Sequence, residues 1–168
     1  MDTFKKKIGL FVGSFDPFHK GHMNILQKSE NIFGQGNVHV CFGVNPDKHQ
    51  INFQNSESPA LRLIQPLEEK AKSLQEKLGT PVNYYMGFLH DYVNELENKG
   101  YDPIVIRGLR NGDDLNYEVN QLRFISDFKP DMKTIFIVCD KEYEHISSSA
   151  IRKLYNFGGE EAIKNYVI

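Results

Sequence analysis

The sequence predicts an α/β fold in which helices cover both faces of an open parallel sheet of five strands. Short runs rich in β-branched and aromatic residues alternate along the chain with longer stretches of helical periodicity. The runs are also almost continuously apolar, as expected for parallel strands that are buried on both faces. This alternation of strand and helix is typical of a Rossmann-like arrangement of βαβ units.

Each expected strand is followed by an expected helix. The strands are IGLFV at 8–12, VHVCFGV at 38–44, VNYYM at 82–86, PIVIR at 103–107 and TIFIV at 134–138. The helices are expected at 20–33, 67–78, 90–99, 114–127 and 148–157.

The clearest helical pattern is the stretch 67–78, where four apolar residues fall on one helical face: Leu67, Ala71, Leu74 and Leu78. Gly79 is a typical helix-ending residue. The preceding segment 51–60 is rich in Asn, Ser and Pro and is expected to be a surface loop. With 168 residues and no repeat or linker, residues 1–168 are expected to form one domain.

Composition excludes several classes of protein. The chain has 22 acidic and 20 basic residues, so it lacks the basic excess of a nucleic-acid binder, and no nucleic-acid partner is expected. Cys41 and Cys139 lie in apolar runs, where a thiol usually packs as a small core residue. Neither a signal peptide nor a membrane span is apparent, which predicts a cytoplasmic protein without a membrane partner.

The loop after the first strand, GSFDPFHKGH at 13–22, is the first candidate site. Ligands of open parallel sheets bind beyond the carboxyl ends of the strands. The loop fits neither the dinucleotide fingerprint nor the common triphosphate loop. Gly13 allows a phosphate to approach the backbone, and a helix that begins near Lys20 favours an anion at its start. His22 could donate a hydrogen bond to a phosphate oxygen, whereas the alternative is a helix-capping histidine.

Cations and hydroxyls follow other strands. Arg107 and Arg110 follow the fourth strand, and guanidinium groups match phosphate oxygens. The alternative is that these arginines pair with nearby carboxylates: Asp113, Asp114 or Glu118. Lys48 follows the second strand and is by default a solvated lysine. A helix start preceded by Ser147, Ser148 and Ser149 is a second candidate anion site.

These segments resemble a known family. GSFDPFHKGH resembles the (T/H)-x-G-H signature of the nucleotidylyltransferase superfamily. IRGLRNGDDLNYE at 106–118 and EYEHISSSAIRK at 142–153 resemble the phosphopantetheine adenylyltransferases in particular. The resemblance covers nearly the whole chain.

The resemblance implies transfer of the adenylyl group of ATP to 4'-phosphopantetheine, which gives dephospho-coenzyme A and pyrophosphate. His22 would stabilise the transition state, and Mg2+ would mask charge on the leaving group, with no protein ligands assigned to the metal. The acceptor would bind Ser14, Lys48, Val93 and Arg107. ATP would bind Ser14, Phe15, His22, Gly108, Leu109, Arg110, Glu118, Tyr143, Glu144, His145, Ile146, Ser147, Ser148 and Ser149. The resemblance also implies a homo-oligomer, a hexamer.

Two alternatives remain open at this stage. His19 completes an H-x-G-H motif that is similar to that of nicotinate mononucleotide adenylyltransferases, so the acceptor could be a nicotinate nucleotide. A nucleotide-binding regulatory protein could keep the same fold without turnover. Retention of His22, Lys48 and both arginines favours an enzyme.

Overall fold

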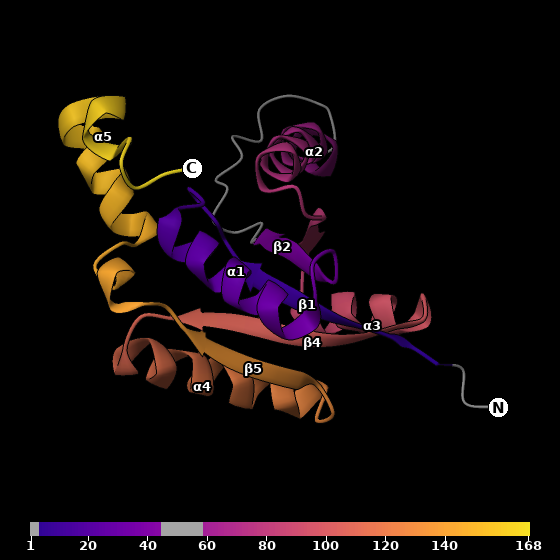
Figure 1. Ribbon diagram of the computed structural model, residues 1–168. Helices are drawn as coiled ribbons and strands as arrows, with labels where there is room; N and C mark the ends of the chain where they lie inside the picture. Colours follow the sequence, from indigo (N-terminus) through magenta and orange to yellow (C-terminus); the bar gives the residue numbers. More distant parts are fainter. Residues whose placement is uncertain (1–3, 45–58) are drawn as a thin grey trace.

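The computed structural model describes residues 4–44 and 59–168, and only the backbone of residues 59–65. Five parallel strands form one sheet in the order β3-β2-β1-β4-β5 (Figure 1). Their bounds are β1 (Lys6–Gly13), β2 (Val38–Val44), β3 (Val82–Met86), β4 (Tyr101–Leu109) and β5 (Lys133–Val138). Every predicted strand is confirmed. The order reverses between β1 and β4, and the crevice at such a switch point is where this type of sheet binds ligands.

Helices α1 to α4 cover the two faces of the sheet, and α5 extends away from it (Figure 1). Their bounds are α1 (Lys20–Phe33), α2 (Pro59–Leu78), α3 (Leu89–Asn98), α4 (Gly112–Phe128) and α5 (Ser148–Ile163), and a short 3₁₀ helix, η2, spans Lys141–Tyr143. Helices α1 and α2 pack against one face. Helices α3 and α4 lie on the opposite face (Figure 1). The predicted Rossmann-like α/β fold is therefore confirmed.

Helix α2 is longer than its periodicity predicts. It begins at Pro59 and contains Pro66, whereas the prediction began at residue 67. A proline in a helix interior removes a backbone hydrogen bond and usually marks a boundary, which explains the late predicted start. Pro59 and Ala60 therefore belong to the helix rather than to the expected loop, and the rest of that loop lies outside the described residues. At the other end, Gly79 has a φ of 65°, as expected of a helix-ending glycine.

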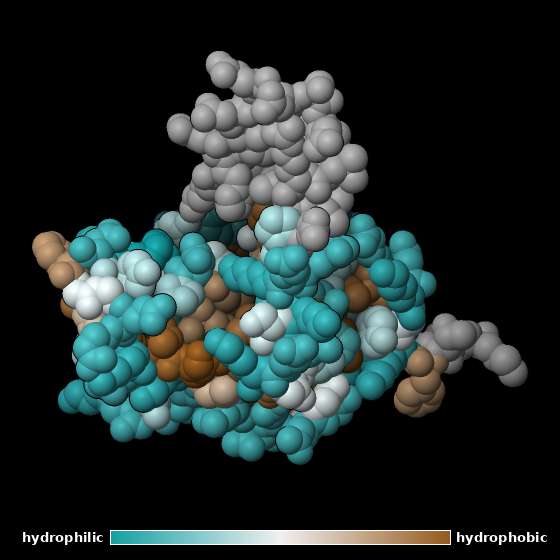
Figure 2. Space-filling model, turned by 90° about the horizontal axis from the view of Figure 1, so that it is seen from above, coloured by the Kyte–Doolittle hydropathy of each residue, from teal (hydrophilic) through white to brown (hydrophobic). Residues whose placement is uncertain are grey.

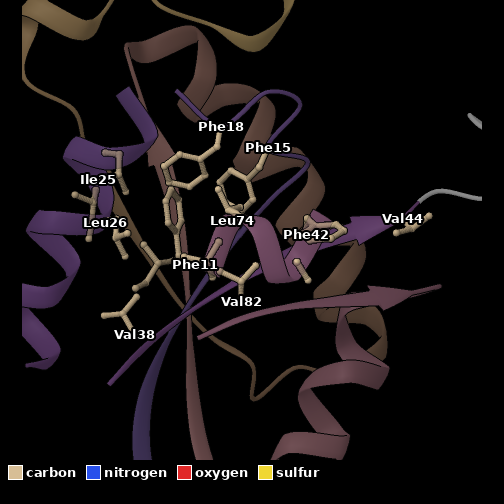
Figure 3. Close-up of a cluster of buried hydrophobic side chains, with 14 of the residues drawn as sticks. Phe11, Phe15, Phe18, Ile25, Leu26, Val38, Phe42, Val44, Leu74 and Val82 are labelled. Carbon is tan, nitrogen blue, oxygen red and sulfur yellow. The ribbon is translucent and has the colours of Figure 1, made fainter. Parts of the chain in front are cut away.

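The larger core lies between the sheet and helices α1 and α2. Phe11 of β1 packs edge to face on Phe15 with ring centroids 5.0 Å apart, and Phe18 follows Phe15 at 5.1 Å. Figure 3 shows these three rings beside Ile25 and Leu26 of α1. Aromatic pairs of this geometry add to the free energy gained by burying their area. The aromatic cluster thus joins the core directly to the loop that carries the first candidate site.

The face seen in Figure 2 is mainly hydrophilic, with hydrophobic side chains in small areas between polar ones. Cys41 and Cys139 are free and buried, as predicted for core thiols. Within the described part of the chain, no helix has both the length and the apolar character required to cross a bilayer.

Candidate active site

A cavity of about 250 Å³ opens at the carboxyl edge of the sheet, at the ends of β1 and β4. Its walls come from the loop after β1, the start of α1, the end of β4, the start of α4 and the start of α5. Most of the predicted site residues line it: Ser14, Phe15, His22, Arg107, Gly108, Leu109, Arg110, Glu118, Ile146, Ser147 and Ser148. Segments that are far apart in the sequence therefore meet at one place.

The loop after β1 is held in a strained conformation. Phe15 has a φ of 46°, which is uncommon for a residue with a side chain, yet its ring is buried in the core. A Cβ on Gly13 would lie 2.9 Å from the Phe15 ring, so only glycine leaves room for this ring. Strain of this kind persists where the surrounding structure enforces it, and such places cluster at functional sites.

The two histidines of the loop cap helix α1 reciprocally. The backbone N–H of His22 donates to Nδ1 of His19 at 3.3 Å, and the backbone N–H of His19 donates to Nδ1 of His22 at 3.2 Å. His19 is the N-cap residue and His22 occupies the third helical position. The capping alternative raised by the sequence is therefore present, and both imidazoles also line the cavity.

His22 is surrounded by aromatic rings. Its ring centroid lies 4.9 Å from that of Phe15, 5.1 Å from that of Phe18 and 6.4 Å from that of Phe11. Burial, followed by the nearby His19 and the charge of Arg110, holds the pKa of His22 well below its usual value. His22 is therefore a neutral imidazole at physiological pH, which can act as a hydrogen-bond donor but not as a cation.

Both arginines of the cavity are paired with carboxylates of α4. Arg107 donates through Nε and Nη2 to the two oxygens of Glu118, at 2.7 and 3.0 Å. Arg110 donates to Asp114 in the same forked manner, at 3.0 Å for each bond. Burial acts to raise the pKa of Asp114, but hydrogen bonds from Arg110 outweigh it and lower that pKa. The ion-pair alternative is thus observed, and it fixes both guanidinium groups at the cavity wall.

The three serines differ in their contacts. Ser147 is the N-cap of α5 and accepts from the backbone N–H of Ala150 at 3.1 Å. Ser148 donates to the carbonyl of Pro17 at 3.0 Å and so joins α5 to the loop after β1. Ser149 is exposed, and its hydroxyl lies 3.3 Å from that of Ser147. Hydroxyls at an open helix start suit an anion, and two of the three line the cavity.

Two further hollows adjoin the first cavity. One, of about 780 Å³, shares Val12, Gly13, Ser14 and Arg107 with it and extends toward β3. The other, of about 160 Å³, lies between α4 and the sheet and has mainly apolar walls that include Tyr85, Leu89, Leu122 and Met132. Arg107 lines all three hollows and therefore stands where they meet.

Some predicted residues lie away from the cavity. Val93 of α3 is 1% exposed and packs in the core on the opposite face of the sheet, with Ile8, Leu10 and Cys41. Glu144 and His145 are exposed, and neither they nor Tyr143 are among the residues lining the cavity. Lys48 lies outside the described residues. Val93 is an apolar residue inside α3, a pattern that core residues share, which explains why the sequence could not place it.

Sequence reasoning missed Lys70 of α2. Its Nζ donates to the carbonyl of Ser14 at 3.3 Å and lies 4.6 Å from the centre of the Phe42 ring. It thereby ties α2 to the loop that separates the two larger hollows. Lys70 stands among other charged residues of an amphipathic helix, so no pattern distinguished it.

A second missed contact joins α1 to the segment after β5. Asn24 donates to a carboxylate oxygen of Asp140 at 2.8 Å and accepts from the backbone N–H of Asp140 at 2.9 Å. Lys28 adds an ion pair to the same carboxylate at 2.6 Å. These bonds join residues 116 positions apart, and an amide in a helical pattern carries no signal of such a partner.

The described residues contain no group of three side chains that could hold a metal ion. The carboxylates nearest the cavity, Asp114 and Glu118, are already occupied by the arginines. Mg2+ commonly binds through substrate phosphates and retained water rather than in a protein cage, and these residues fit that mode of binding.

Comparison with known proteins identifies the family. Residues 10–154 match the family model described as cytidylyltransferase-like. The phosphopantetheine adenylyltransferase of Streptococcus pneumoniae (strain JJA) is 32% identical over 157 residues, which are 93% of this chain and 88% of the relative. The chain belongs to the phosphopantetheine adenylyltransferase family. The enzyme of that name from Dictyoglomus thermophilum is 31% identical over 150 residues, 89% of this chain and 82% of the relative.

Solved structures agree on the fold. A Vibrio parahaemolyticus protein described as a nicotinate-nucleotide adenylyltransferase matches 96% of this chain and 86% of its own, with a TM-score of 0.54 and 13% identity. A NadR protein in complex with NAD and AMP-PNP matches 92% of this chain and 44% of its own, with a TM-score of 0.51 and 16% identity. At these identities the likeness concerns the fold.

Proposed function

We propose that the protein transfers the adenylyl group of ATP to 4'-phosphopantetheine and releases pyrophosphate and dephospho-coenzyme A. The observation that carries this proposal is the shared wall at Arg107 and Ser14. Two phosphate-bearing molecules that occupy the two larger hollows would meet there. The family of the chain, with relatives that are 32% identical over most of its length, supports the same reaction.

The smaller of these two hollows suits the triphosphate of ATP. It combines the neutral imidazole of His22 with the guanidinium group of Arg110 and the open start of α5 at Ser147 and Ser148. Helix starts and arginine forks are the groups that bind phosphates most readily. Mg2+ would enter with the triphosphate and neutralise charge on the departing pyrophosphate.

The chemical step needs no covalent intermediate on the protein. A phosphate oxygen of the acceptor attacks the α-phosphorus of ATP and forms a new P–O bond, while the bond from the α-phosphorus to the bridging oxygen of pyrophosphate breaks. Negative charge builds on the oxygens of the α-phosphate as this happens. His22 donates its Nε2–H to one of them, which stabilises the transition state more than the ground state. The protein contributes position and electrostatics.

The acceptor side favours a molecule with an extended arm. The acceptor phosphate would lie in the 780 Å³ hollow beside Arg107, and its arm would enter the adjoining 160 Å³ hollow between Leu89, Leu122 and Met132. Pantetheine is a flexible chain with apolar segments, which fits a narrow slot with apolar walls. Lys48, from the segment after β2, is proposed as a second contact of the acceptor phosphate.

Helix α4 offers a surface for assembly into a homo-oligomer, as the family resemblance implies. Tyr117, Phe124 and Phe128 of this helix are 63%, 67% and 66% exposed. Large exposed aromatic side chains on one helix commonly mark contacts with another protein. We propose that copies of the chain associate through this face of α4.

A nicotinate nucleotide is the second candidate acceptor. The observation that favours it is His19, which lines the cavity and completes the H-x-G-H motif. A nicotinate ring has no long arm, so it would leave the slot beside Leu122 unused.

The test is a panel of acceptors. The purified protein is incubated with ATP and Mg2+ and with 4'-phosphopantetheine, nicotinate mononucleotide or flavin mononucleotide, and pyrophosphate release is measured for each. CTP replaces ATP in a parallel series. Release with ATP and 4'-phosphopantetheine alone supports the proposal. Release with nicotinate mononucleotide alone would identify that nucleotide as the acceptor in place of 4'-phosphopantetheine. Release with none of the acceptors would favour a regulatory nucleotide-binding protein.

A further inference from the structure

We propose that Asn24 is a positioning residue, whose bonds to Asp140 hold helix α1 at a fixed place against the segment that leads to α5. We call this pair of residues the clasp. The inference rests on the proposed function, because it concerns the placement of His22 relative to the triphosphate. Neither residue of the clasp is among those that line the cavity, so the clasp acts through the groups that it holds.

The side chain of Asn24 makes both bonds of the clasp. Its Nδ2 donates to Oδ2 of Asp140 at 2.8 Å, and its Oδ1 accepts the backbone N–H of Asp140 at 2.9 Å. Because a backbone N–H can only donate, it identifies which atom of the amide is the oxygen. Asn24 is 8% exposed, and a buried polar group that loses its partners destabilises the folded state. A side chain at this position without polar atoms would therefore lose both bonds.

Lys28, one turn further along α1, adds two contacts to the clasp. Its Nζ pairs with Oδ1 of Asp140 at 2.6 Å and donates to the carbonyl of Val138 at 2.9 Å. Hydrogen bonds from Lys28 and then from Asn24 lower the pKa of Asp140, so this group is a carboxylate at physiological pH. The ion pair is partly exposed to solvent, and such pairs contribute little on their own. The buried amide of Asn24 is therefore the main part of the clasp.

The clasp lies where the chain leaves the sheet. The backbone N–H of Cys139 donates to the carbonyl of Leu109 at 2.8 Å, one residue past the end of β5. The next backbone N–H, that of Asp140, bonds to Asn24 instead of to β4. Asn24 thus supplies the partner that this N–H requires and fixes the backbone at the first residue beyond the sheet.

Two backbone turns connect the clasp to the cavity. The carbonyl of Asp140 accepts the N–H of Tyr143 at 2.9 Å, and the carbonyl of Tyr143 accepts the N–H of Ile146 at 3.0 Å. Ile146 is buried and lines the cavity, and Ser147 follows it as the N-cap of α5. The position of Asp140 therefore determines where the start of α5, the proposed triphosphate site, lies.

The other side of the clasp belongs to the helix of His22. Asn24 follows His22 by two residues in α1, so the clasp sets the spacing between the imidazole and the start of α5. In the proposed reaction the α-phosphate must meet His22 while the departing pyrophosphate lies at the start of α5. A misplacement of about 1 Å between such groups can cost about a hundredfold in rate. The effect should appear in kcat, because the bond from His22 strengthens in the transition state.

An exchange of the two side chains tests the clasp. Asn24→Asp keeps an oxygen for the backbone N–H of Asp140 but places two carboxylates in contact, and like charges repel. Adding Asp140→Asn returns a donor to the new carboxylate, which lies four residues before Lys28 and can pair with it. We expect Asn24→Asp to lower kcat about tenfold to a hundredfold, and the double variant to recover most of this loss. The dissociation constant of ATP should stay within about threefold in both.

A milder variant and a matched control complete the set. Asp140→Ala keeps the backbone N–H bonded to Asn24 and loses only the carboxylate, so kcat should fall several-fold. It provides the test should Asn24→Asp fail to fold. Thr80→Val removes another buried hydrogen bond, at 2.8 Å to the carbonyl of Val38 at the amino end of β2. It should lower the temperature of thermal unfolding and leave kcat within about twofold. A purely structural Asn24 would behave as Thr80 does.

Hydrogen exchange of the backbone amides in 140–149 provides a readout without substrates. In the free protein, Asn24→Asp should exchange these amides faster than the wild type, whereas the double variant and Thr80→Val should not. Failure of every acceptor in the panel would refute the proposed function and leave this readout intact. Wild-type exchange in a folded Asn24→Asp would overturn the clasp. Wild-type kcat in Asn24→Asp, with the acceptor that the panel identifies, would overturn its positioning role.

Discussion

Arg107 and Glu118 face each other across the entrance to the slot between α4 and the sheet, with two parallel hydrogen bonds of 2.7 and 3.0 Å. The remaining bond of Arg107 goes to the carbonyl of Val12 at 3.3 Å, so β1, β4 and α4 all meet at one guanidinium group. A cation held in this way needs little reorganisation when a phosphate arrives. Glu118 therefore serves the site by orienting its arginine.

Glu118→Gln is expected to weaken the acceptor site. The amide cannot receive both bonds of the guanidinium fork as an anion does, so Arg107 loses its fixed orientation. We predict that the KM for 4'-phosphopantetheine rises about tenfold, while kcat changes less. Asp127→Asn, an exposed carboxylate at the far end of the same helix, is the control and should leave both constants unchanged. An unaltered KM in Glu118→Gln would show that the ion pair of Arg107 with Glu118 does not contribute to acceptor binding.

Val93 and Leu122 should respond in opposite ways, because only Leu122 lines the slot. Val93→Ala removes buried methyl groups from the core and should lower the free energy of unfolding by about 2 kcal/mol, with an unchanged KM for either substrate. Leu122→Gln should raise the KM for 4'-phosphopantetheine several-fold and leave that for ATP unchanged. Urea denaturation and steady-state kinetics of both variants check this. A rise in the KM of Val93→Ala would show that Val93 contributes to substrate binding.

The sequence alone predicts all five strands and the carboxyl edge where the site lies, because the apolar runs and their order determine both. It also points to the loop of His22 and the two arginines. It could not show that Asp114 and Glu118, rather than Asp113, receive the arginines, since that choice depends on the orientation of α4. Contacts such as those of Lys70 arise from tertiary packing, which local patterns do not encode.

Stability should fall on mild acidification. Burial, followed by the charge of Arg110, lowers the pKa of His19 to about 4 from an ordinary value of 6.5. Below its ordinary pKa, His19 therefore binds a proton in the unfolded chain but not in the folded chain. The contribution of neutral His19 to the free energy of unfolding is complete above pH 6.5 and is lost as the pH falls toward 4.

For His19 alone, we predict a loss of about 2 kcal/mol in the free energy of unfolding between pH 7 and 5. His22 should add to this loss, because its pKa is lowered too. Urea denaturation at both pH values measures how much the free energy of unfolding changes with pH, and this change should be smaller in His19→Asn. Equal slopes for wild type and His19→Asn would show that His19 is not the residue excluding the proton.

Association through α4 predicts a change in mass. Phe124→Lys with Phe128→Lys replaces two exposed aromatic rings by charges, which should disfavour contact between two apolar faces. Light scattering coupled to size exclusion should show oligomers for the wild type and smaller species for the double variant. Arg123→Lys, on the same helix, is the matched control. An unchanged mass in the double variant would show that the contact between copies lies on another surface.

Turnover by His22→Ala tests most directly whether this imidazole stabilises adenylyl transfer at the strand edge. With ATP, Mg2+ and 4'-phosphopantetheine, we predict that kcat falls by about two to three decades, as expected when one transition-state donor is lost. The dissociation constant of ATP, measured separately by calorimetry, should stay close to that of the wild type. Wild-type turnover by His22→Ala would contradict the account and remove this residue from the mechanism.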